Sequence, residues 1–116
     1  RVLFRSPAPS FFQGAVLNAF AAMKRGRLRL IASPDGAQGS VRIHQDARVY
    51  AALLDGAERA EHRLASGRRA YVHVARGSAS VNGERLSAGD ALKTEGGEIR
   101  IEQGDGAEVL VFDLEA

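Results

Sequence analysis

The amino-acid sequence predicts an all-β fold, a sandwich or barrel built from many short strands. Apolar and polar residues alternate over short windows, as from Tyr71 to Ala75, which is the period of a half-buried strand. Turn signals made of Gly, Pro, Asn and Asp separate these windows. No helical pattern follows Met23, and a chain of 116 residues has the length of one domain.

The N-terminal segment, residues 1–23, differs in character from the domain that we expect over residues 24–116. Ser10 is a suitable N-cap for a short helix from Phe11 to Met23. A second interpretation is that the segment is an irregular tail that is non-native or truncated. It rests on the opening sequence RVLFRS, whose back-translation resembles the end of a sequencing-library adapter.

From Lys24 onward, short strands are expected to follow one another, each ended by a turn. The expected strands cover residues 27–33, 40–44, 48–54, 61–64, 71–75, 78–81, 92–94, 98–102 and 108–114. The expected breaks are Pro34-Asp35-Gly36, Asp55-Gly56, Gly77, Asn82-Gly83, Gly96-Gly97 and Gly104-Asp105-Gly106. Asn82-Gly83 supplies two residues that tolerate positive φ, which is the requirement of a type I′ hairpin turn.

The final strand has a nearly continuous apolar sequence from Val109 to Leu114. A strand of this kind is often buried on both faces, whereas the outer face of a single sandwich is normally wet. We therefore expect the Val109–Leu114 region to pack against something besides the opposite sheet. The candidates are a missing domain, a second chain and the N-terminal segment.

The composition excludes several classes of protein. With 45% hydrophobic and 26% charged residues, the chain is globular rather than disordered. The absence of cysteine excludes disulfides and thiolate metal sites and fits a reducing compartment, so we expect a cytoplasmic location. No apolar run approaches the ~20 residues that span a bilayer, so we expect no membrane partner.

The net charge of +2 comes from 16 basic and 14 acidic residues, and the basic excess lies in the first quarter of the chain. A basic patch can bind nucleic acid. Here no aromatic interleaving and no helix-turn-helix pattern accompanies it. We therefore interpret the basic residues as a solvated face and expect no nucleic-acid partner.

Three stretches carry a family resemblance: KRGRLRLIASPDG, GSVRIHQDARVYAALLDG and GRRAYVHVARGSASVNGERLSAGDAL. On these stretches the chain resembles, from Lys24 to Leu114, the C-terminal half of bacterial pirin-like proteins. These are bicupins, and some are described as quercetin 2,3-dioxygenases. The resemblance implies a cupin β-sandwich or barrel of jelly-roll type.

In such proteins the N-terminal cupin carries a metal on three histidines and a glutamate, and this metal supports oxygen chemistry on a flavonol. The C-terminal cupin has a similar fold and usually lacks the ligands. Because the resemblance covers only the C-terminal half, we expect no catalytic, cofactor-binding or metal-binding residue in this chain. A divalent metal is expected only in the missing N-terminal cupin.

The chain can also be compared with the ligand pattern of a metal cupin, which is a His-x-His pair, a Glu soon after, and a His on a later strand. His62 stands near the position of the pair, but Leu64 takes the place of the second histidine. The expected Glu falls in residues 67–69, which are Gly-Arg-Arg, and arginine cannot ligate a metal. No histidine follows Gly89. Most of the ligand set is therefore missing.

The histidines His44, His62 and His73 offer an alternative site. His44 and His73 lie opposite their apolar strand neighbours, so both are expected to face solvent or an interface. Their spacing gives no reason for all three rings to converge on one metal. We interpret them as scattered histidines.

The function that these observations favour is structural. The chain is interpreted as a metal-free cupin domain that supports a missing N-terminal catalytic cupin and is inactive alone. Two alternatives stay open. One is a small-molecule-binding module, since cupin barrels keep a cavity without metal. The other is a protein-interaction module that uses the Val109–Leu114 region.

Overall fold

The computed structural model describes residues 2–5, 28–43 and 46–115, with only the backbone described for residues 2–5. The elements are β1 (Val2–Arg5), β2 (Arg29–Ser33), the 3-10 helix η1 (Ala37–Gly39), β3 (Val41–Arg42), β4 (Ala47–Leu54), β5 (Ala60–Val81), β6 (Glu84–Ser87) and β7 (Asp90–Glu115). The all-β prediction is confirmed for these ranges. The helix expected from Phe11 to Met23 and the position of His44 lie outside them. No helix in the described ranges is long and apolar enough to cross a membrane.

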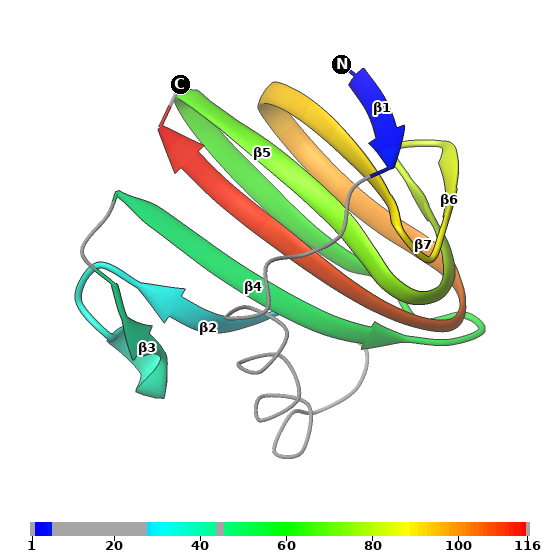
Figure 1. Cartoon of the computed structure of the whole chain (residues 1–116), viewed down its shortest axis with the longest axis horizontal. Helices are drawn as coiled ribbons and strands as arrows, with labels where there is room; N and C mark the ends of the chain where they lie inside the picture. The colour runs from blue at the N-terminus through cyan, green and yellow to red at the C-terminus, as the bar shows by residue number, and fades with distance from the viewer. Residues whose placement is uncertain (1, 6–27, 44–45, 116) are drawn as a thin grey trace.

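The strands form one hydrogen-bonded sheet in the order β3-β2-β4-β7-β5-β6, with β1 paired to β7. The long strands β5 and β7 curve strongly and carry the chain from one layer of the molecule to the other (Figure 1). In one layer, residues 70–74 of β5 pair with residues 109–113 of β7, and in the other, residues 60–64 pair with residues 97–101. Within each run the partner number falls as the β5 number rises, so the paired segments are antiparallel. The sheet folds over itself as the predicted sandwich.

Several of the expected breaks prove to be bends inside continuous strands, so the predicted strand boundaries are wrong there. β5 runs on through Gly77, and β7 runs through Gly96-Gly97 and Gly104-Asp105-Gly106. Gly77 and Gly96 keep positive φ angles of 65° and 61°. Glycine lets a strand bend sharply while its ladder continues. The glycines indicate an irregularity in the sequence. They do not reveal the pairing partners that keep the strand continuous, because those partners lie far away in the chain.

The core lies between the two layers. Its large, fully buried side chains come from both layers and include Leu54, Val72, Val74, Val81, Leu86, Leu92, Ile99, Ile101, Val109 and Val111. Burying a side chain of this size stabilises the folded state by roughly 1.5–3 kcal/mol. Because both layers contribute to this core, each layer is stabilised by its contact with the other.

A second apolar cluster lies on the opposite face of the layer that contains β2, β4 and the end of β7; we call it the outer cluster. Its buried members are Ile31, Ala32, Val49, Ala51, Leu110 and Phe112. Along β7, Val109 and Val111 belong to the core, whereas Leu110 and Phe112 belong to the outer cluster. The prediction that the last strand is buried on both faces is confirmed. The partner expected on its outer face stays a prediction.

Two turns with particular backbone requirements form as predicted. Asn82 and Gly83 have φ angles of 49° and 84°, which fits the type I′ turn expected between β5 and β6. At the turn after β2, the N–H of Ala37 donates to Oδ1 of Asp35 at 3.1 Å. This backbone hydrogen bond holds the pKa of the Asp35 carboxyl below its usual value. Both turns are local in sequence, which is why their residue types predict them.

Candidate functional site

A polar cluster lies at the end of the sandwich where β4 begins and β7 ends. Ala47 of β4 pairs with Leu114 of β7 at this end, and Figure 1 shows the two strand ends side by side. The cluster, which we call the end cluster, consists of Asp46, Tyr50, His62, Arg68 and Asp113.

Strand alternation directs the side chains of His62 and Asp113 toward the inside of the sandwich. His62 lies between Ala60 and Leu64 on β5, two positions that both belong to the core. Asp113 lies two residues after the core residue Val111 on β7, so both side chains point to the same face of the strand. Polar residues therefore replace apolar ones where the core reaches the end of the sandwich.

Asp113 is the centre of this cluster. Its side chain is 8% exposed, and its two carboxylate oxygens accept hydrogen bonds from Nε2 of His62 at 2.9 Å and from Nε of Arg68 at 2.5 Å. A carboxylate so far from water is strongly destabilising unless it is paired and hydrogen-bonded. These two contacts supply both the charge partner and the hydrogen bonds.

The guanidinium of Arg68 is saturated by acceptors. Besides the bond from Nε, Nη1 lies 3.2 Å from each carboxylate oxygen of Asp46. Nη2 donates to the backbone carbonyl oxygens of Asp46 at 3.3 Å and Asp113 at 3.1 Å. These contacts match the five N–H donors of a guanidinium. The hydrogen bond to Asp113 raises the pKa of Arg68 above its usual value, so Arg68 is a permanent cation in this cluster.

Asp113 also determines the tautomer of His62. Because a carboxylate only accepts hydrogen bonds, Nε2 of His62 carries the proton when the ring is neutral. The ring of Tyr50 lies beside His62, with the ring centroids 4.6 Å apart and the planes tilted by 45°. Burial raises the pKa of Tyr50, and the charge of Asp113 adds to this shift.

The residues around His62 do not fit the metal of a catalytic cupin. In the sequence, the position at which a metal cupin has its glutamate falls within Gly67-Arg68-Arg69. In the structure, Arg68 lies in the same cluster as His62, since both contact Asp113. A guanidinium cannot ligate a metal and repels it. Over residues 28–43 and 46–115, no group of three or more His, Cys, Asp or Glu side chains is arranged to hold a metal ion.

From the sequence, we predict that His73 faces either solvent or an interface. The structure shows that it does not face solvent, because the residue is buried. Its side chain is 3% exposed and lies on the face of β5 opposite the core residues Val72 and Val74. The ring of Tyr71 stacks near it, with centroids 6.3 Å apart. Burial lowers the pKa of His73, and its Nδ1 atom is buried without a hydrogen-bond partner among the described residues. Periodicity predicts the face of a strand, but only tertiary packing decides whether that face is covered.

The two described histidines do not converge. His62 points into the end of the core, whereas His73 points to the opposite side of its layer. His44 lies outside the described residues, so the three-histidine alternative is decided only for this pair. His62 and His73 do not share a metal site.

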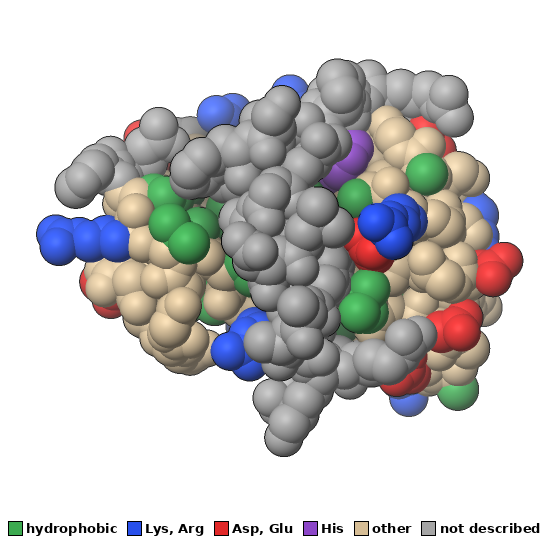
Figure 2. All heavy atoms as spheres, turned by 60° about the horizontal axis from the view of Figure 1, so that its bottom comes forward, with side chains coloured by type: hydrophobic (Ala, Val, Ile, Leu, Met, Phe, Trp, Pro, Cys, Tyr) green, Lys and Arg blue, Asp and Glu red, His purple; other side chains and the backbone are tan. Residues whose placement is uncertain are grey.

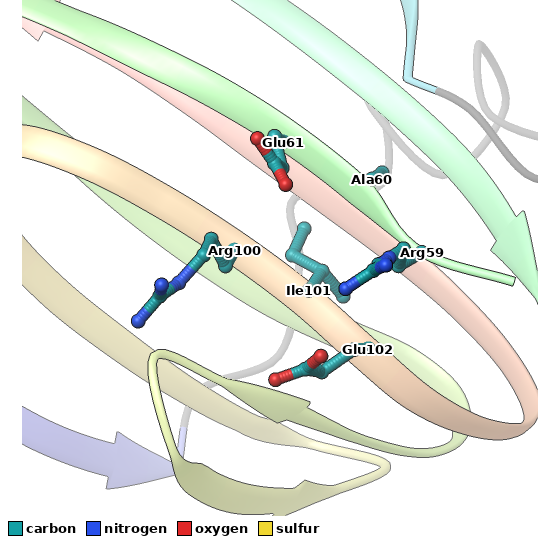
Figure 3. Close-up of a pocket in the computed structure, with 6 residues that line it drawn as sticks. All are labelled: Arg59, Ala60, Glu61, Arg100, Ile101 and Glu102. Atoms are coloured by element: carbon teal, nitrogen blue, oxygen red, sulfur yellow. The ribbon is translucent and has the colours of Figure 1, made fainter. Parts of the chain in front are cut away.

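A small surface pocket lies on the other layer, between β5 and β7 (Figure 3). It is lined by Arg59, Ala60, Glu61, Arg100, Ile101 and Glu102. Glu61 lies directly opposite Arg100 in the ladder, so acidic and basic side chains alternate around the pocket. Its volume of about 10 Å³ admits roughly one water molecule. The pocket is too small for an organic substrate.

Charged side chains of both signs are also interspersed on the face of the molecule shown in Figure 2. The described part of that face carries small hydrophobic areas between them. Nucleic-acid-binding surfaces instead gather basic side chains on one face or along one stripe. On the described part of this face, basic side chains are not gathered into one stripe.

Sequence reasoning singled out His62 and Arg68 but missed Asp113, the residue that joins them. His62 and Asp113 are 51 positions apart, so no local motif connects them. One signal was available, because Asp113 is an acid within a strand that is otherwise apolar. A buried acid requires a cationic or hydrogen-bonding partner. The apolar strand around Asp113 therefore predicts a cationic partner for it, and the fold identifies this partner as Arg68.

Comparison with known proteins agrees with this fold. Residues 30–114 match the family described as the quercetinase C-terminal cupin domain. The chain belongs to this family. This cupin domain is 36% identical over 87 residues to a quercetin 2,3-dioxygenase of Escherichia coli strain K12, covering 74% of the chain and 38% of that relative. It is 42% identical over 72 residues to a putative quercetin 2,3-dioxygenase of Pseudomonas aeruginosa, covering 61% of the chain and 31% of that relative.

Two solved structures from Escherichia coli resemble this cupin domain. The bacterial pirin YhhW of Escherichia coli, in complex with nickel(II), superposes with a TM-score of 0.74 at 33% identity, and the match covers 80% of the present chain and 41% of the pirin chain. The protein YhaK of Escherichia coli superposes with a TM-score of 0.70 at 28% identity, covering 81% and 44%. The prediction of a cupin fold in the pirin family is confirmed. The chain spans less than half the length of each of these relatives.

Proposed function

We propose that this domain is the metal-free, structural cupin of a pirin-type bicupin and that it supports a catalytic cupin upstream of it in a longer protein. The pairing of Arg68 with Asp113 carries this proposal. A catalytic cupin needs several neutral imidazoles and a carboxylate that leave coordination positions open for substrate. The end cluster instead offers one imidazole, and its carboxylates are bound to a permanent cation.

The lengths of the relatives support the bicupin part of the proposal. The Escherichia coli relative extends far beyond the matched region, which makes up 38% of it. The family description assigns the matched region to a C-terminal cupin. In the proposed protein, the metal and the oxygen chemistry on a flavonol would belong to the remaining length. We also propose a cytoplasmic location, which the absence of cysteine favours.

We propose that the outer cluster faces this upstream cupin. Leu53 and Leu114 are half-buried and pack against its buried members, and so does Ile43. Half-buried apolar side chains around a buried centre would gain stability from further burial in an interface. The Val109–Leu114 region would then contribute its outer face to the contact between the two cupins, as its apolar sequence suggested.

The proposal predicts that the 116-residue chain is catalytically inactive. The purified protein should contain no stoichiometric iron, copper, nickel or manganese by inductively coupled plasma mass spectrometry. It should not consume oxygen with a flavonol such as quercetin, followed by oxygen electrode and by absorbance. The Escherichia coli relative, assayed in parallel, serves as the positive control. Stoichiometric metal together with turnover in the 116-residue chain would overturn the proposal.

The genomic DNA upstream of Lys24 provides an independent test. A structural cupin of this kind should follow a region that encodes a second cupin with a His-x-His pair, a glutamate and a later histidine. An upstream region that encodes no cupin would contradict the supporting role. It would leave the fold and the family unchanged.

A further inference from the structure

The hairpin turn between β5 and β6 presents an Asn-Gly step at the surface. Asn82 is half-buried and Gly83 is exposed. Asparagine is among the thermolabile residues of proteins, because the next backbone nitrogen can attack its side-chain amide. Glycine leaves that nitrogen unhindered, since it has no side chain beside it. The step is therefore a candidate site of covalent self-modification.

The reaction is a ring closure followed by hydrolysis. The backbone nitrogen of Gly83 forms a bond to Cγ of Asn82 and loses its proton, and the side-chain nitrogen leaves as ammonia. Water then opens the resulting five-membered succinimide at one of its two carbonyl carbons. Attack at the former side-chain carbonyl gives aspartate, and attack at the main-chain carbonyl gives isoaspartate. The sequence consumes one water, releases one ammonia and needs no oxidant or reductant.

In the folded chain, Arg100 of β7 holds both the backbone and the side chain of Asn82. The backbone N–H of Asn82 donates to the carbonyl oxygen of Arg100 at 2.9 Å. Oδ1 of Asn82 accepts from the backbone N–H of Arg100 at 2.8 Å. The side-chain carbonyl thus takes the place that a backbone carbonyl has in a strand ladder. These two hydrogen bonds fix the group that must turn toward Gly83 for the ring to close.

The backbone of the turn also keeps the reacting atoms apart. The φ angles of Asn82 and Gly83, 49° and 84°, fit a type I′ turn, in which ψ of the first central residue is about +30°. At this ψ the Gly83 nitrogen points away from Cβ of Asn82 about the Cα–C bond. A five-membered ring needs the two atoms nearly eclipsed about that bond. The turn must therefore open before the ring can close, and such local opening has its own free energy.

We propose that Asn82 is a site of spontaneous deamidation and isomerisation whose rate is set by opening of the β5-β6 hairpin. The two products differ in their effect on the fold. Aspartate keeps an oxygen that accepts from the N–H of Arg100, whereas isoaspartate adds a backbone carbon to a two-residue turn and disturbs the pairing of β5 with β6. This modification is independent of the supporting role proposed above, because it requires only the hairpin and water.

The test follows residue 82 of the purified 116-residue chain during incubation in mildly alkaline buffer, with and without guanidinium chloride. Peptide mapping by mass spectrometry measures conversion of Asn82 to its acidic products, and an isoaspartyl methyltransferase assay measures isoaspartate. The folded chain should react at least roughly tenfold more slowly than the unfolded chain, since an opening free energy of about 1.4 kcal/mol gives this factor. Equal rates in the two states, or an unfolded chain that keeps Asn82 intact, would overturn the proposal.

Two variants test the chemistry and the role of hairpin opening. In guanidinium chloride, Gly83→Ala should slow the reaction several-fold, because its methyl group hinders the attacking nitrogen. In buffer, Leu86→Ala should accelerate the reaction, because Leu86 is fully buried and anchors β6 in the core. The control is Val41→Ala, which removes an exposed side chain outside the hairpin and should leave the rate unchanged. An unchanged rate in either test variant contradicts the proposed route.

Arg85→Ala replaces Leu86→Ala if circular dichroism shows that the core variant does not fold. The guanidinium of Arg85 donates to Oγ of Ser78 and to the carbonyl oxygen of Gln103, so its removal loosens the hairpin and leaves the core intact. This variant should also react faster than Val41→Ala, and equal rates would count against the proposal. The effect of each product is measured separately. Asn82→Asp should melt close to the wild-type chain, whereas incubated protein enriched in isoaspartate should melt at a lower temperature.

Discussion

Nε of Arg68 donates a hydrogen bond to Oδ1 of Asp113 at 2.5 Å, and this contact joins the middle of β5 to the end of β7. The two residues are 45 positions apart in sequence. The same guanidinium reaches Asp46, which immediately precedes β4. One side chain thus links three segments that meet at one end of the sandwich. We expect the stability of the domain to depend on this residue, because it compensates a buried carboxylate.

Replacement of Arg68 by methionine should lower the free energy of unfolding by about 3 kcal/mol, because removal of one partner of a buried ion pair leaves an uncompensated charge. Urea denaturation at neutral pH measures the change. In the double variant with Asp113→Leu, part of the stability should return, since the unpaired carboxylate is gone. If Arg68→Met were no more destabilising than Arg63→Met on the exposed face, the end cluster would not be a source of stability.

The buried ring of His73 should make the domain less stable in mild acid. Burial lowers its pKa below the usual 6.5, so the folded state stays neutral at a pH where the unfolded chain binds a proton. Because the unfolded state then binds more protons, the free energy of unfolding falls as the pH drops below about 6.5, and continues to fall until the folded ring also titrates.

Substitution of His73 by leucine tests whether this residue causes the predicted fall in the free energy of unfolding at lower pH. Between pH 7.5 and pH 5.5, chemical denaturation should show a smaller loss of stability in the variant than in the wild-type chain. At the higher pH the variant should be at least as stable, since leucine removes a buried nitrogen that has no hydrogen-bond partner in the described part of the chain. Parallel pH profiles for the two proteins would show that His73 does not titrate in this way.

The two-sided burial of the last strand can be probed with one acidic substitution on each face. Val111→Asp places a charge in the core, and Phe112→Asp places one in the outer cluster. Each should lower stability by about 3 kcal/mol or more, or prevent folding, because neither charge has a partner. Val41→Asp is the matched control, since Val41 is 47% exposed. An outer-face variant as stable as this control would show that the outer cluster contributes little.

Substitutions at Gly83 and Gly77 distinguish the destabilising effect of backbone strain from that of a steric clash. A Cβ at Gly83 would meet no atom within 4 Å, so Gly83→Val should destabilise only through its φ of +84°, by about 1–2 kcal/mol. A Cβ at Gly77 would lie 2.2 Å from the carbonyl oxygen of Asp105. Gly77→Ala should therefore lower the melting temperature more than Gly83→Val, although alanine is smaller. Wild-type stability of Gly83→Val would refute the type I′ turn.

Local features of this protein were predictable because their causes are local. The Asn82-Gly83 turn follows from two residues that tolerate positive φ, and the alternation from Tyr71 to Ala75 follows from the pleat of a strand. At Gly77 and Gly96, by contrast, the sequence alone predicts strand ends, whereas the structure has bends inside continuous strands. Whether a glycine ends a strand or only bends it depends on the hydrogen-bond partners beside it, which lie far away in the sequence.

By itself, the sequence determined the fold class, the pirin-type cupin family and the missing ligand pattern around His62. It also predicted that Val109 to Leu114 is buried on both faces, because the run of apolar side chains leaves no face for water. Only the tertiary structure decided that His73 is buried and that Arg68 pairs with Asp113. Those results depend on which distant strands become neighbours, and a one-dimensional pattern contains charge and hydrophobicity but not the distance between two side chains.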